Sequence, residues 1–174
     1  MALLVVVAGC TTTSVVEEPD PAAVLSGEPV AIGAEPTGPV TALGSGEVLD
    51  LGWRYVIYES AEGWCTELQM VEVTSTSCGP DLLPPEGEHI GSVGALESLG
   101  NGLTPVAGIV SDEIHTVSVL DEADVRRLPG VLMPLDEAGL DGQAFLAFMP
   151  ADMTPTHVQV LVQNGEIVQT YELP

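Results

Sequence analysis

Polar and apolar side chains alternate in short runs from Glu47 onward, and Gly, Pro, Asn and Asp residues separate these runs. This spacing is typical of antiparallel β-strands, and no segment shows sustained helical periodicity. The clearest case is Thr156–Leu173, because its central Asn164-Gly165 favours a two-residue type I′ turn. The turn sets a register that pairs Val162 with Ile167, Val160 with Gln169, Val158 with Tyr171, Leu161 with Val168, Gln159 with Thr170 and His157 with Glu172. We expect Val158, Val160, Val162, Ile167 and Tyr171 to point inward.

A second hairpin is predicted over Trp53–Val71, around a loop at residues 60–63. This register places six large apolar side chains on one face: Trp53, Tyr55, Ile57, Trp64, Leu68 and Met70. Because aromatic side chains bury large areas, this face is expected to form the centre of the core. Cys65 falls on the opposite face, beside Tyr58.

Further strands are expected near Ile90–Leu96, Thr104–Val110, Ile114–Leu120, Gly130–Pro134 and Ala144–Met149, the last apolar on both faces. Asp121–Leu128 fits either one helical turn or a disordered loop. Seven or eight short strands indicate an all-β fold, an antiparallel β-sandwich. The run Gln143–Pro150, followed by the final hairpin, resembles the immunoglobulin-like domains of secreted lipoproteins from high-GC bacteria. This resemblance is one of pattern, and it implies no activity.

The amino terminus is an apolar run, residues 1–9, that ends in small residues before a cysteine. Eight apolar residues span only about 12 Å as a helix, which is too short to cross a bilayer core of about 30 Å. Val7-Ala8-Gly9-Cys10 resembles the lipobox of bacterial lipoproteins. The resemblance implies that residues 1–9 are the remnant of a signal peptide, that Cys10 is lipidated, and that the protein is anchored on the extracytoplasmic face of the cell membrane. No basic residue precedes the run, so we expect the true start to lie upstream; a buried first strand is the alternative interpretation.

The stretch from Thr11 to Gly46 holds five prolines and no aromatic residue. Such a segment can bury too little apolar surface to offset the conformational entropy that it would lose on ordering. We therefore predict a lipid-anchored flexible tether over residues 10–46 and a β-sandwich domain over residues 47–174. Docking of Glu28–Leu43 on the domain is an alternative that the sequence leaves open.

The chain has three cysteines, and lipidation of Cys10 would leave Cys65 and Cys78 as a pair. Exported proteins lie in oxidising compartments, so a disulfide is expected between them, holding the polar segment Thr74–Ser77 over the sheet. A metal site is disfavoured because the spacing is far from C-x-x-C and no partner cysteines exist.

The chain carries three Arg, no Lys and 26 acidic residues, a net charge of −23. So acidic a surface repels phosphate backbones, which excludes nucleic-acid binding. The same charge favours a soluble, monomeric exported protein.

The common local motifs of hydrolases, zinc proteases and nucleotide enzymes are absent, so no catalytic residue, metal or cofactor is predicted. Of three histidines, His157 faces Glu172, and His115 shares a strand face with apolar residues at the border of the core. His89 lies in a loop with Glu86 and Glu88 and is the one that is free to act. We expect a non-enzymatic binding module for an unknown protein, glycan or cell-wall ligand. The alternative is a small hydrolase or cation-dependent enzyme that uses His89 and nearby carboxylates.

Overall fold

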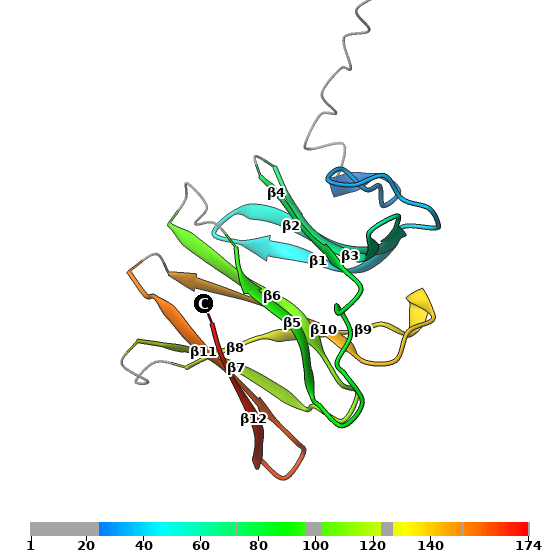
Figure 1. The fold of residues 1–174 in the computed structure, drawn as a ribbon. Coiled ribbons are helices and arrows are strands. Elements are labelled where there is room, and N and C mark those ends of the chain that lie inside the picture. Colours follow the sequence, from blue (N-terminus) through cyan, green and yellow to red (C-terminus); the bar gives the residue numbers. More distant parts are fainter. Residues whose placement is uncertain (1–24, 72, 97–101, 123–126, 151, 174) are drawn as a thin grey trace, which may run out of the picture.

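A computed structural model describes residues 25–71, 73–96, 102–122, 127–150 and 152–173 (Figure 1). Their strands are β1 (Thr41–Val48), β2 (Leu51–Ser60), β3 (Gly63–Met70), β4 (Thr74–Gly79), β5 (Ile90–Ala95), β6 (Leu103–Val110), β7 (Thr116–Asp121), β8 (Arg127–Pro129), β9 (Val131–Pro134), β10 (Gln143–Pro150), β11 (Pro155–Leu161) and β12 (Ile167–Glu172), with a 3₁₀ turn at Asp136–Ala138. All pairings between strands are antiparallel. The predicted all-β, antiparallel sandwich architecture is confirmed.

The strands form three four-stranded sheets. The first has the order β1-β2-β3-β4, the second β5-β6-β10-β9 and the third β12-β11-β7-β8. The second sheet contributes to two clusters of buried apolar side chains, one shared with the first sheet and one with the third. Alternate residues of β10 belong to different clusters. Ala144 and Leu146 pack with the first sheet, whereas Phe145 and Ala147 pack with the third. This explains why β10 is apolar on both faces.

The predicted hairpin of β2 and β3 has the expected register. Its inner face supplies Trp53, Tyr55, Ile57, Leu68 and Met70 to the first apolar cluster, and Trp64 packs against that cluster. Tyr58 lies opposite Cys65 on the outer face, as predicted.

The final hairpin confirms four predicted pairs, from His157–Glu172 to Val160–Gln169. The pairs Leu161–Val168 and Val162–Ile167 are wrong, because the register shifts after Val160 and Leu161 pairs with Ile167. Gly165 has a φ of 81°, whereas Asn164 does not have a positive φ, so the turn is not type I′. Val162 and Glu166 close a three-residue loop instead. Val158 and Val160 are buried and Tyr171 is partly buried, but Ile167 is exposed, contrary to prediction.

The predicted boundary at residue 47 is too late, since β1 begins at Thr41 and pairs with β2. Residues 25–40, here called the N-terminal strap, lie along the outer face of the first sheet (Figure 1). Docking of Glu28–Leu43 on the domain, the alternative that the sequence left open, is therefore what the structure shows. Residues 1–24, including Cys10, lie outside the described residues.

The structure contradicts two other predictions, which concern Thr74–Ser77 and the end of Asp121–Leu128. Thr74–Ser77 lies beside β3 as part of the edge strand β4, and not over the sheet. Arg127 and Leu128, predicted as part of a helical turn or loop, belong to strand β8, which pairs with β7; residues 123–126 are outside the described part. Among the described residues, no helix has the length and apolar character needed to span a bilayer.

Candidate functional site

His89, the histidine of the alternative enzyme hypothesis, lies near the hydroxyl of Ser111 and the carboxylate of Glu113. Its Nδ1 lies 3.1 Å from Ser111 Oγ and 4.0 Å from Glu113 Oε2. A relay from an acid through histidine to a nucleophile uses the two ring nitrogens separately, whereas here both groups approach the same one. Within the described ranges, no three His, Cys, Asp or Glu side chains are grouped so that they could hold a metal ion.

The other two histidines have surface positions. His115 is exposed, so the prediction that it borders the core is wrong; Ile114, beside it, is the buried residue. His157 faces Glu172 in the register, as predicted, and its Nδ1 lies 3.0 Å from Thr156 Oγ1.

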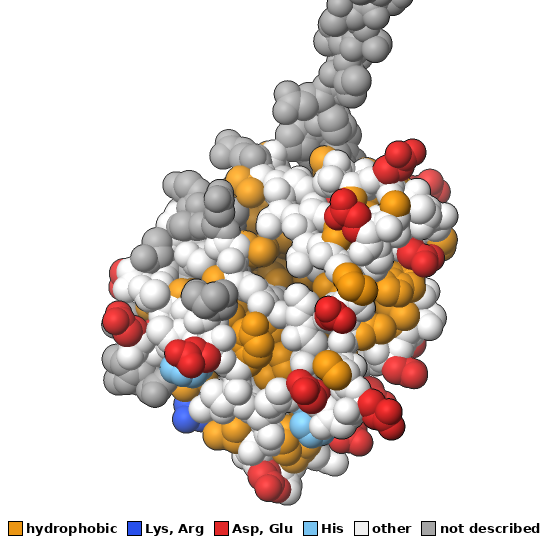
Figure 2. Space-filling model, viewed as in Figure 1, with side chains coloured by type: hydrophobic (Ala, Val, Ile, Leu, Met, Phe, Trp, Pro, Cys, Tyr) orange, Lys and Arg blue, Asp and Glu red, His pale blue; other side chains and the backbone are white. Residues whose placement is uncertain are grey.

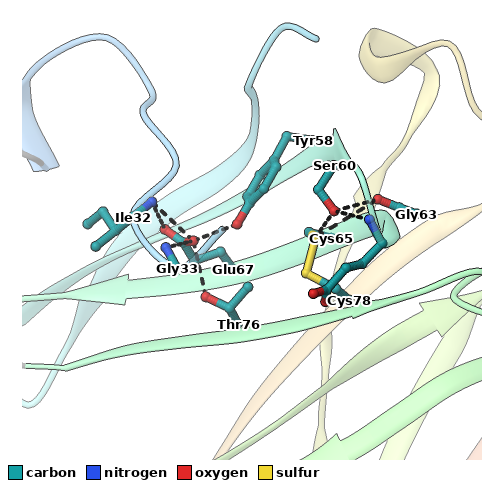
Figure 3. Close-up of a disulfide and its surroundings, with 10 residues drawn as sticks. Ile32, Gly33, Tyr58, Ser60, Gly63, Cys65, Glu67, Thr76 and Cys78 are labelled. Carbon is teal, nitrogen blue, oxygen red and sulfur yellow. Dashed lines mark hydrogen bonds between the residues drawn. A yellow bond between two sulfur atoms is a disulfide. The ribbon is translucent and has the colours of Figure 1, made fainter. Parts of the chain in front are cut away.

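Cys65 and Cys78 form the predicted disulfide and are direct partners across β3 and β4. Cys65 is fully buried, and Ser60 Oγ lies 3.2 Å from its sulfur (Figure 3). The bond ties the edge strand β4 to the middle of the first sheet.

Next to the disulfide, the outer face of β3 carries a completely buried carboxylate, Glu67 (Figure 3). Backbone N–H groups of Ile32 and Gly33 donate to it at 3.0 and 2.8 Å. Three side chains also donate: Tyr58 Oη at 2.9 Å, Thr76 Oγ1 at 3.1 Å and Gln69 Nε2 at 2.6 Å. The carboxylate therefore joins the strap to strands β2, β3 and β4.

Arg54 is the second buried charge of this face. Its Nε donates to Gln69 Oε1 at 3.2 Å and its Nη1 to the carbonyl of Gly27 in the strap at 2.9 Å. Gln69 thus links the guanidinium to Glu67, and its Nε2 also donates to the Val30 carbonyl. Burial lowers the pKa of Arg54, and Nη2 is a buried nitrogen without a partner in the described part of the chain.

Two tyrosines of β2, one on each face of the first sheet, have raised pKa values. Burial raises the pKa of Tyr58 to about 12, and the hydrogen bond to Glu67 and its charge act in the same direction. Burial likewise raises the pKa of Tyr55, on the inner face, to about 12. Both phenols are therefore neutral at physiological pH.

Sequence reasoning missed this polar cluster. Arg54, Glu67 and Gln69 alternate with the inward-facing residues of β2 and β3, so they lie on the face opposite the core, where alternation predicts solvent-exposed side chains. They are buried because the strap covers them, and nothing in the local pattern of β2 or β3 signals that contact.

The space between the first and second sheets opens to the surface beside β4 and β5. Two hollows lie there, with volumes of about 70 and 120 Å³. Small side chains of Ser75, Ser77 and Ser92 leave the edge open, and Leu68, Leu82 and Leu96 line the hollows. Figure 2 shows apolar atoms at the base of this depression. Neither hollow is lined by a charged residue, although the chain has 26 acidic ones.

In comparisons with known proteins, no protein-family model, curated protein or solved structure matches the chain.

Proposed function

We propose that this protein is a lipid-anchored binding module, held on the extracytoplasmic face of the cell membrane through Cys10 and presenting its β domain to a protein, glycan or cell-wall ligand. The observation that carries the binding role is the pair of uncharged hollows beside β4. On a chain of net charge −23, an open apolar site free of carboxylates is the surface best suited to recognition.

The proposed location rests on two features. Val7-Ala8-Gly9-Cys10 resembles a lipobox, and a diacylglycerol on the Cys10 sulfur would supply the two acyl chains that stable attachment needs. The Cys65–Cys78 disulfide fits an oxidising compartment outside the cytoplasm.

The experiment is to express the full chain with a complete signal sequence and fractionate the cells. The parent should sediment with membranes, whereas Cys10→Ser should move to the soluble extracellular fraction because the sulfur that carries the lipid is lost. Thr13→Ser, a neighbouring substitution that keeps the cysteine, is the matched control and should partition like the parent. Identical partition of exported Cys10→Ser and parent would overturn the anchor.

A further inference from the structure

Edge strands expose unpaired backbone groups, and proteins commonly protect them with charges, prolines, bulges or short length. Of the six edge strands in the described sheets, β8 and β9 have three and four residues, and β1, β5 and β12 have irregular registers. The edge of β5 is also covered, since Ser92 N–H donates to the Leu82 carbonyl at 3.0 Å. In contrast, β4 has six residues in regular register, with no charge and no proline. No strand of the described residues pairs with its outer edge, which is therefore available to a further strand.

The register identifies which backbone groups of β4 are free. Cys65 and Cys78 are opposite each other with a Cα–Cα distance of 4.1 Å, the short spacing of a pair without mutual backbone hydrogen bonds. Alternation then directs the N–H and C=O groups of Thr74, Thr76 and Cys78 away from β3. These three residues form a ladder edge for an incoming strand.

The same edge lies over the two hollows. Ser75 and Ser77 are the inward residues of β4, and both line the smaller hollow. A strand added beside β4 would point alternate side chains in the same direction, over the hollows, because side chains on one strand face repeat every second residue. Gly94 of β5 leaves room there, since a Cβ at this position would meet no heavy atom within 4 Å.

We propose that β4 binds an extended segment of a partner protein by strand addition. Two alternate aliphatic side chains of the segment fill the hollows, and Lys or Arg residues flank them. The flanking cations follow from charge complementarity to a chain of net charge −23. The same charge opposes pairing with a second copy of this chain. This inference rests on the proposed function, for which it names the partner class.

The test uses the full chain with Cys10→Ser, so that the protein is soluble, and a phage-displayed library of random nine-residue peptides. Enriched peptides are expected to carry alternating aliphatic residues with basic flanks. The tightest is synthesised, and binding should shift the backbone amide resonances of Thr74, Thr76 and Cys78. Methylating the peptide nitrogens that face β4 should weaken binding at least tenfold, because strand addition requires those donors.

Gly94→Leu places a side chain in the hollow and should also weaken binding at least tenfold. Gly38→Leu is its control, because Gly38 also has open space around its Cβ position but lies in the strap. It should bind within twofold of the parent. Circular dichroism of both variants confirms that they fold.

Each other outcome is decisive. Peptides that bind elsewhere, or that tolerate Gly94→Leu and N-methylation, overturn strand addition and leave the binding role in place. Failure to enrich any peptide also overturns it, and pull-down from intact cells then judges the binding role separately. A dimer in sedimentation that Gly94→Leu abolishes would replace the partner segment with a second copy. Loss of membrane attachment alone would refute the anchor and not the edge site.

Discussion

The Glu67→Gln substitution is the sharpest test of how the N-terminal strap is held. The exchange keeps the size of the side chain but replaces one carboxylate oxygen with an NH₂ group. Each oxygen of Glu67 accepts from at least one N–H group, which cannot itself accept: Gln69 Nε2 donates to Oε1 and Gly33 N to Oε2. The new NH₂ group therefore faces such a donor in either orientation. We expect a large loss of stability with little change in packing volume.

The magnitude follows from the less damaging orientation. With NH₂ at the Oε1 position, Gln69 Nε2 loses its acceptor, whereas the Ile32 N–H keeps Oε2 at 3.2 Å. A hydrogen bond to a charged group contributes about 1.5–3 kcal/mol, so losing this one costs at least about 1.5 kcal/mol. Gln69 cannot turn its amide to compensate without breaking the bond that its Oε1 accepts from Arg54. This is a substantial part of the roughly 5–15 kcal/mol that stabilises a typical domain.

The assay is urea unfolding of the full chain, together with limited proteolysis under native conditions. A loss of about 2 kcal/mol lowers the midpoint by about 1 M at the usual urea dependence of about 2 kcal/mol per M. Cleavage within residues 25–40 should accelerate before cleavage of the sheets. Glu59→Gln, at an exposed position of the same hairpin, is the control and should change stability by less than about 0.5 kcal/mol. If Glu67→Gln and Glu59→Gln unfold alike, the carboxylate does not hold the strap.

Two further predictions concern the same sheet. In the Cys10→Ser protein, reduction should add the mass of two hydrogen atoms, and replacing both Cys65 and Cys78 by serine should cost about 3 kcal/mol in the chain-entropy model; two free thiols in the untreated protein would contradict the pairing. Folding raises the pKa of Tyr55 and Tyr58 from 10 to about 12, so their neutral forms stabilise the fold fully below pH 10, and this contribution is lost as the pH rises toward 12. Ultraviolet titration should show these phenols ionising near pH 12 in the folded protein, and ionisation of both near pH 10 without unfolding would refute their burial.

The parts of the fold that follow from local patterns could be predicted. The register of β2 and β3 depends on alternation and a tight turn, both visible in the sequence, and the inner face of this hairpin was correctly assigned. The predicted register of the final hairpin was wrong only near its loop. There, Asn164 Oδ1 accepts the N–H of Glu166 at 2.9 Å, and Gly165 alone of the central pair takes a positive φ. The dipeptide indicated a turn but not which type the hairpin would use.

The parts that depend on distant contacts could not be predicted. β4 is rich in Ser and Thr and has no apolar alternation, so it is a strand only because β3 pairs with it and Cys78 bonds to Cys65. Glu67 has the sequence appearance of an exposed strand residue, yet residues about 35 positions upstream bury it. The open edge beside β4 likewise depends on two sheets meeting, which no single segment encodes.

The docked strap also sets the path of a mechanical force. A pull on the chain upstream of residue 25 first meets the bond from Arg54 to the Gly27 carbonyl, then that from Gln69 to Val30, and then the grip of Glu67 on Ile32 and Gly33. These bonds anchor in β2 and β3, the central strands of the first sheet. Tension would therefore load these hydrogen bonds in the middle of the sheet, including those of the charged Arg54 and Glu67, before it reached the edge strand β1. Strand β1 would thus be protected from separating from β2.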